Sequence, residues 1–201
     1  MRMTMVAAAL AAGAAAAPAS AAETLTLPRF EQIEVVGGGS VTVRHGARQK
    51  VTIVRGDNRT SRVEVTARST GGRGRSSIGS NPRLVVEGCR SRCPRGYRLE
   101  LVVETPDIRA LAVKGGGAIR AENGFPRQDQ LAISVHGGGQ IDTRSVRADS
   151  VAASVNGGGL ITLAADESLA ASVNGGGAIR YWGDPQVATA IKGGGTVSRV
   201  R

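Results

Sequence analysis

The stretch Val155-Asn156-Gly157-Gly158-Gly159-Leu160-Ile161 decides how the chain folds, because the sequence contains six versions of it. Each version has a β-branched residue, any residue, three glycines, any residue and a second β-branched residue. The first glycines of the triplets are residues 37, 115, 137, 157, 175 and 193. The last five triplets are therefore separated by 22, 20, 18 and 18 residues. A short period of this kind is typical of a repeat architecture.

Aliphatic residues lie at constant offsets from the last five triplets. Two residues before the first glycine stand Val113, Val135, Val155, Val173 and Ile191, and four residues after it stand Ile119, Ile141, Ile161, Ile179 and Val197. Positions of equal parity point to one face of a strand, so each unit consists of a strand, a glycine bend, a second strand and a return loop. Stacked units would pair in parallel, and parallel connections are right-handed.

We therefore predict an all-β fold in which residues 106–201 form a right-handed parallel β-helix or β-roll solenoid with 18–22-residue coils. An antiparallel sandwich or barrel is the alternative, because it also has short strands joined by glycine turns. It does not explain why the same residue types recur at the same offsets.

Residues 23–105 alternate apolar and polar residues in short segments, which predicts an N-terminal set of strands and hairpins. Segments 84–86 and 99–103 are expected to form one hairpin, with Cys89 and Cys93 at its tip. Regions 23–105 and 106–201 are expected to form one continuous domain, since their length suits a single core.

Residues 1–22 have the pattern of a secretory signal peptide: an early cation at Arg2, an apolar run and small residues before Glu23. The protein is therefore expected to be exported, to the periplasm, the cell surface or the medium, and no later run predicts a membrane span. In an oxidising compartment Cys89 and Cys93 are expected to form a disulfide. A redox-active pair is the alternative, although its usual spacing has two intervening residues rather than the three found here.

The glycine triplets have three interpretations. A phosphate-binding loop requires Gly-Lys-Ser/Thr before a helix, and calcium-binding β-rolls require aspartates at a fixed place, which only Asp142 supplies. The remaining interpretation is structural: glycine permits bends with positive φ and lets stacked corners approach closely.

Two groups of polar side chains are candidates for contact with a ligand. The sequence carries 26 Lys and Arg against 16 Asp and Glu, and its cations are densest in two loops around residues 68–75 and 90–98. A second group precedes the glycine triplets and is expected to form an outward row. The candidates are Arg73, Arg75, Arg90, Arg92 and Arg95 in the loops, and Lys114, His136, Asn156, Asn174 and Lys192 beside the triplets.

Other function classes find less support in the sequence. Nucleic-acid binding is not expected, since stacking aromatic residues and known binding motifs are missing. The pair Tyr181-Trp182 could stack on a sugar or be buried at the end of the stack. No motif predicts catalytic residues, a metal site or a cofactor, so we predict a non-enzyme; a polysaccharide lyase or hydrolase is the alternative, because its acids converge in space rather than in sequence.

Three segments carry a resemblance to a known family. They are Phe30-x-x-Ile33-x-Val35-x-Gly37, Pro106-Asp107-Ile108-x-x-Leu111 and the Val-x-Gly-x-Gly-x-Ile units that follow. Together they resemble the family labelled putative auto-transporter adhesin, head GIN domain, from about Phe30 to Val197. The resemblance implies an exported β-solenoid with an adhesin-like label and no established activity. Relatives often have Gly-Ser-Gly in place of Gly-Gly-Gly, and the Cys89–Cys93 loop does not match the family pattern.

We therefore predict a non-enzymatic, exported, adhesin-like binding module. Its expected partners are an anionic envelope polysaccharide or another envelope protein. The alternative is a structural, self-assembling envelope protein that forms a homo-oligomer through an uncapped C-terminal edge, since unprotected sheet edges tend to pair.

Overall fold

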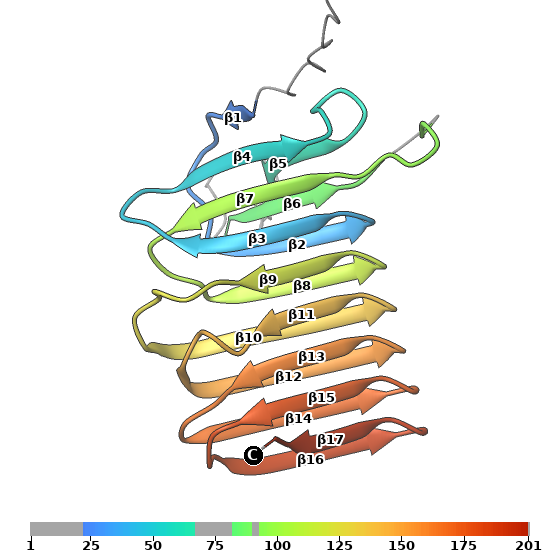
Figure 1. Ribbon diagram of the computed structural model, residues 1–201. Helices are drawn as coiled ribbons and strands as arrows, with labels where there is room; N and C mark the ends of the chain where they lie inside the picture. The colour runs from blue at the N-terminus through green and yellow to red at the C-terminus, as the bar shows by residue number, and fades with distance from the viewer. Residues whose placement is uncertain (1–21, 67–81, 90–92, 201) are drawn as a thin grey trace, which may run out of the picture.

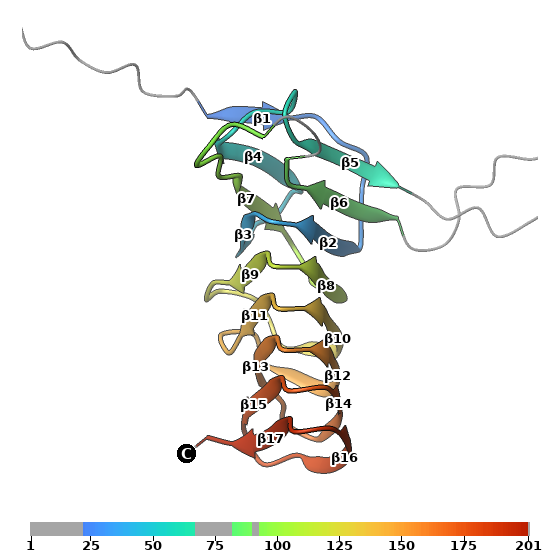
Figure 2. The same ribbon diagram turned by 90° about the vertical axis from the view of Figure 1, so that its right-hand side faces the viewer.

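The computed structural model describes residues 22–66, 82–89 and 93–200, which form two facing β-sheets (Figures 1 and 2). The all-β prediction is confirmed. The nine-stranded sheet has the order β1-β4-β7-β3-β9-β11-β13-β15-β17, and the eight-stranded sheet has the order β16-β14-β12-β10-β8-β2-β6-β5. The strands are β1 Glu23–Leu25, β2 Gln32–Gly37, β3 Ser40–His45, β4 Lys50–Arg55, β5 Arg62–Thr66, β6 Arg83–Glu87, β7 Glu100–Thr105, β8 Ala110–Gly115, β9 Ala118–Ala121, β10 Gln128–Gly137, β11 Gln140–Thr143, β12 Ala148–Gly157, β13 Leu160–Ala164, β14 Ser168–Asn174, β15 Ala178–Trp182, β16 Gln186–Lys192 and β17 Thr196–Arg199.

The prediction of a right-handed parallel β-helix is wrong. The strands belong to two separate sheets that do not close, and both sheets mix parallel and antiparallel pairs. The antiparallel pairs are β1 with β4, β4 with β7 and β5 with β6. Constant offsets of aliphatic residues predict which strands stack, but they do not specify whether stacked strands close or leave open edges.

The predicted hairpin of segments 84–86 and 99–103 is also wrong, because β6 and β7 lie in different sheets. β6 pairs with β2 and β5, whereas β7 pairs with β3 and β4. The first glycine triplet lies beside the second, with Gly37 opposite Gly115, although residues 40–114 separate them in the sequence. Strands β2 and β3 therefore sit inside the sheets, between the N-terminal strands and the strand pairs that follow (Figure 1).

The core fills the space between the sheets and consists almost entirely of aliphatic side chains. Val35, Val113 and Val135 of the eight-stranded sheet face Ile119 and Ile141 of the nine-stranded sheet, and all five are at most 1% exposed. Each such side chain stabilises the fold by roughly 1.5–3 kcal/mol relative to an exposed position. The positions that the offsets predicted to face inward are buried up to Ile179.

The glycine corners connect the two sheets and pack directly on one another, at the right of Figure 1. The amide of Gly158 donates a hydrogen bond of 3.1 Å to the carbonyl oxygen of Gly137 in the preceding corner. Gly157 has a φ of +121°, and a Cβ added there would lie 2.7 Å from the same oxygen. The structural interpretation of the triplets is therefore supported at this corner by both conformation and close approach.

The packing at this corner predicts that alanine substitutions at two adjacent glycines differ sharply in their effect on stability. Gly157→Ala should destabilise the fold by roughly 1–3 kcal/mol, since it forces a left-handed conformation and a clash with a backbone oxygen. Gly158→Ala is the matched control, because a Cβ there would meet nothing within 4 Å. Urea unfolding measures both; equal midpoints for the two variants would contradict the structural interpretation.

Candidate functional site

The polar residues that precede the last five glycine triplets form a straight row on the outer face of the eight-stranded sheet. The pairing register places His136 between Lys114 and Asn156, and Asn174 between Asn156 and Lys192. All five side chains are exposed. We call Lys114, His136, Asn156, Asn174 and Lys192 the corner row.

Of the five candidate arginines in the two loops, only Arg95 lies among the described residues. Arg95 is exposed in the turn between β6 and β7, away from the corner row in sequence and in sheet order. Arg73, Arg75, Arg90 and Arg92 lie outside the described residues. The predicted disulfide is confirmed, with 2.08 Å between the Sγ atoms of Cys89 and Cys93.

A row of alanines runs parallel to the corner row on the same outer face, and sequence reasoning missed it. Register places these five alanines side by side across five strands. The signal was present in the sequence, because each one lies five residues before the first glycine of a triplet. The alanine row consists of Ala110, Ala132, Ala152, Ala170 and Ala188.

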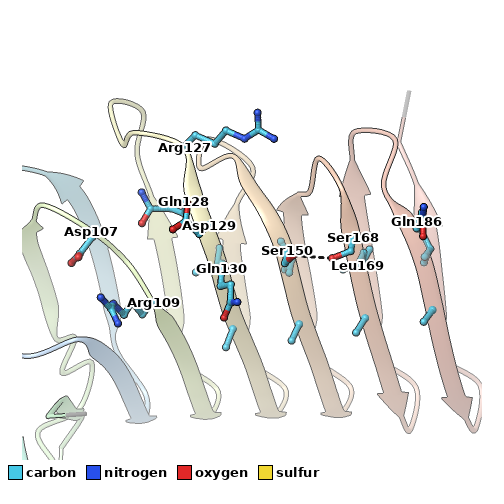
Figure 3. A pocket seen from close by; sticks show the side chains of 17 residues that line it. Asp107, Arg109, Arg127, Gln128, Asp129, Gln130, Ser150, Ser168, Leu169 and Gln186 are labelled. Carbon is cyan, nitrogen blue, oxygen red and sulfur yellow. Dashed lines mark hydrogen bonds between the residues drawn. The ribbon is translucent and has the colours of Figure 1, made fainter. Parts of the chain in front are cut away.

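Small and polar residues border the alanine row on both sides. On the side of the glycine corners, a row of Ala112, Ser134, Ser154, Ser172 and Ala190 separates it from the corner row. On the other side lie Gln130, Ser150, Ser168 and Gln186, which Figure 3 shows in line across the strands. The Ser168 hydroxyl donates a hydrogen bond of 3.0 Å to the Ser150 hydroxyl.

These rows line two open hollows of about 920 and 740 Å³. The hollows share Ala132, Ala152, Ala170 and Ala188, so they form one continuous trough along the alanine row. Lys114 is the one member of the corner row that lines it; the other four stand beyond its border. The floor is flat because no long side chain rises from the alanine row or from its serine-containing neighbour.

A buried carboxylate with two cations closes the trough at β2. Glu34 is 5% exposed. Its Oε1 atom forms an ion pair of 2.8 Å with Lys114 Nζ, and its carboxylate also contacts the guanidinium of Arg83. Burial alone would raise the pKa of Glu34, but the hydrogen bond from Lys114 and the charges of Arg83 and Lys114 outweigh it and hold the pKa below its ordinary value. Glu34 thereby fixes two cations at this end of the floor.

A second charged group lies on the return-loop side of the trough, where Figure 3 shows Arg127 above the strands. Arg127 contacts Asp149 and lies 3.5 Å from both Asp166 and Glu167. Arg109 lines the same hollow, 3.9 Å from Glu31. The β2 end and the return-loop side of the trough thus carry fixed charges, while the alanine row that forms its floor carries none.

The site has the features of a binding surface. Among residues 22–66, 82–89 and 93–200, no group of three His, Cys, Asp or Glu side chains could hold a metal ion. Across the same ranges, no helix has the length and apolarity needed to cross a bilayer. An open apolar floor with hydrogen-bonding borders can hold a ligand by surface contact and polar groups together.

The ion pairs of Glu34 predict a pH-dependent contribution to stability. Glu34→Gln should destabilise the protein by roughly 1–3 kcal/mol at neutral pH, because Arg83 and Lys114 lose a charged partner. Because the pKa of Glu34 is lower in the folded state than in the unfolded state, its ionised carboxylate stabilises the fold at pH values above the unfolded-state pKa. The difference in the free energy of unfolding between wild type and variant should therefore disappear as the pH falls below 4.5 and through the lower pKa of the folded state.

Unfolding by urea across a pH series measures this difference. Glu64→Gln is the matched control, since Glu64 pairs with Arg62 on the same sheet but its side chain is 34% exposed. A deficit of Glu34→Gln that persists unchanged at low pH would contradict the assignment.

Comparison with known proteins identifies relatives of the fold. No curated protein matches the chain. A crystal structure of a putative adhesin from Bacteroides fragilis NCTC 9343 is similar, with a TM-score of 0.53 and 18% identity over 89% of this chain and 96% of that one. Also similar are a putative lipid binding protein from Parabacteroides distasonis ATCC 8503 (TM-score 0.35, 15% identity, 90% and 96% covered) and a putative cell adhesion protein from Clostridium sporogenes ATCC 15579 (TM-score 0.40, 10% identity, 89% and 97% covered).

The sequence itself matches one family model, over residues 29–130 and 126–185. The two segments span more than half of the 201 residues and include every strand except β1, β16 and β17. An adhesin family fits an exported or surface protein that binds a partner. The chain belongs to the family described as "Putative auto-transporter adhesin, head GIN domain".

Proposed function

We propose that the protein is a non-enzymatic, adhesin-like binding protein that holds an extended anionic polysaccharide of the cell envelope in the trough. The observation that supports this most is the alanine row, because outward positions of exposed strands usually carry longer side chains. Five successive strands instead present a methyl group at the same place. Because these methyl groups are short, a ligand can lie close to the backbone along the whole alanine row.

The periodicity of the trough suits a polymer. Neighbouring strands lie about 4.8 Å apart, so a chain that crosses them meets the same floor at each step, over a length of about 19 Å. Serine hydroxyls lie on one side of the alanine row, and Gln130, Ser150, Ser168 and Gln186 lie on the other. These groups donate and accept hydrogen bonds, as the hydroxyls of a sugar chain require.

The charge of the protein favours an anionic ligand. The lining itself carries no excess of positive charge, because Arg83 and Lys114 pair with Glu34, and Arg109 and Arg127 pair with carboxylates at the border of the trough. The whole sequence has a formal net charge of +10, which attracts polyanions over a longer range. Export to the periplasm or to the cell surface would bring the protein to such polymers, and the adhesin description of the family supports this location.

Filling the trough should weaken polymer binding without unfolding the protein. Ala152→Tyr places a large side chain on an exposed floor position, so we expect binding of polygalacturonate to weaken by at least roughly tenfold, or about 1.4 kcal/mol. Ala178→Tyr is the matched control, because Ala178 points outward from the nine-stranded sheet. Isothermal titration calorimetry measures both variants, with dextran as a neutral polymer.

Wild-type binding should also fall as salt rises, since the attraction is partly between exposed charges. Equal affinity of Ala152→Tyr and Ala178→Tyr for polygalacturonate would place the polymer elsewhere. Absence of wild-type binding across a panel of anionic glycans would overturn the proposed ligand class.

A second candidate function, self-assembly, rests on strand β16. Val187 and Ile191 are 39% and 45% exposed, although they pair in register with Leu169 and Val173, which are 1% exposed. Among the described strands, β16 is an edge whose inner face carries uncovered aliphatic side chains. An edge of this kind can pair with a second copy of the chain.

Self-assembly predicts that a charge on the inner face of β16 blocks association. Ile191→Glu should reduce the mass measured by light scattering at high concentration, since an inward charge protects a sheet edge. Ala190→Glu is the control, because Ala190 faces outward on the same strand. A wild-type protein that stays monomeric at every concentration would remove this candidate.

A further inference from the structure

The outer face of the nine-stranded sheet carries a pocket of about 520 Å³ beside the return loops, on the opposite side of the molecule from the trough. Its lining combines the single tryptophan of the sequence, Trp182, with three arginines. The chain has only five aromatic residues other than histidine, and this one is half-buried and borders an open pocket. The lining arginines are Arg120, Arg144 and Arg147.

Arg144 and Trp182 form the fixed part of the pocket. Arg144 donates two hydrogen bonds to Asp142, from Nε to Oδ1 at 2.9 Å and from Nη2 to Oδ2 at 2.8 Å. Its guanidinium carbon lies 5.4 Å from the centroid of the Trp182 ring, within the range of a cation–π interaction. Trp182 stands opposite the small residue Ala164 of β13, which lines the same pocket.

The other two arginines give the pocket an excess of positive charge. Arg147 pairs with Asp166 at 2.9 Å, yet its side chain is 70% exposed. Arg120 makes no side-chain hydrogen bond or ion pair with any described residue. Three guanidinium groups therefore meet two carboxylates, Asp142 and Asp166, and Arg120 remains available for an anion.

From this geometry we propose that the pocket binds a single sugar residue that carries a carboxylate. The apolar face of the sugar ring packs against the part of the Trp182 indole that Arg144 leaves exposed, and the carboxylate accepts hydrogen bonds from Arg120 and Arg147. An indole provides a flat apolar surface with a π-system, and guanidinium groups bind carboxylates with planar, charge-assisted hydrogen bonds. This site is separate from the trough and does not depend on the function proposed for it.

Because Trp182 is the only tryptophan, its fluorescence reports on the pocket directly. We expect a saturable change in Trp182 emission when the protein is titrated with sodium galacturonate at constant ionic strength. Galactose lacks the carboxylate, and sodium acetate lacks the ring, so neither should reproduce the change. Galacturonate and polygalacturonate in parallel distinguish a free acidic sugar from a residue within a polymer.

Two variants locate the effect. Arg120→Ala should weaken the galacturonate response by roughly tenfold, since a charged hydrogen bond is lost. Arg109→Ala is the matched control, because Arg109 immediately precedes β8 of the other sheet and lines the trough. Far-UV circular dichroism shows whether both variants retain the fold.

The outcomes separate this site from the trough. Ala152→Tyr should leave the galacturonate response unchanged, and Arg120→Ala should leave polymer binding in the trough unchanged. A flat titration, an equal response to galactose or acetate, or a response that Arg120→Ala does not alter would each overturn the proposed pocket, whatever the result for the trough.

Discussion

The close packing of one glycine corner on the next is the constraint on which the rest of the structure depends. The Cβ of any other residue at Gly159 would lie 2.4 Å from Val135 Cγ1 and 2.7 Å from the carbonyl oxygen of Gly139. Because the backbones meet this closely, successive strand pairs cannot slip past one another. A shift of one residue would turn every buried valine and isoleucine toward solvent. The corners therefore fix the register, and the register fixes which side chains share a row.

Because residues at equal offsets align in straight rows, the outer faces of the two sheets differ in the size and charge of their side chains. On the eight-stranded sheet, small residues at equal offsets produce a floor without protruding side chains. On the nine-stranded sheet, the corresponding outward positions hold Arg120, Asp142, Thr162 and Arg180 in sequence along the row, so this face carries charged side chains of both signs. One face suits contact over a long distance, and the other suits a compact ligand at a single place.

The sequence was sufficient to predict strands, buried positions and the disulfide, because each depends on local spacing. It was not sufficient to predict that β6 and β7 separate into different sheets, since the partner of a strand is chosen by contacts far away in sequence. Ala152 and its equivalents were visible at a constant offset, but a small outward residue gives no hydrophobic period to detect. Arg144 follows β11 and Trp182 ends β15, with β13 between them, so the two residues meet only through the stacking of the sheet and neither alone indicated a pocket.

The alanine row has a consequence for how binding strength could change over evolution. Each strand pair adds one alanine, its bordering polar groups and about 4.8 Å of floor. Duplication of a single pair would therefore lengthen the trough without disturbing the core, because each pair contacts mainly its neighbours. Ligand valency would rise by one step with each copy, and affinity for a polymer would increase through multivalency rather than through any new kind of contact. Under the proposed function, the number of strand pairs that carry an alanine would therefore set the length of polymer that the trough can hold.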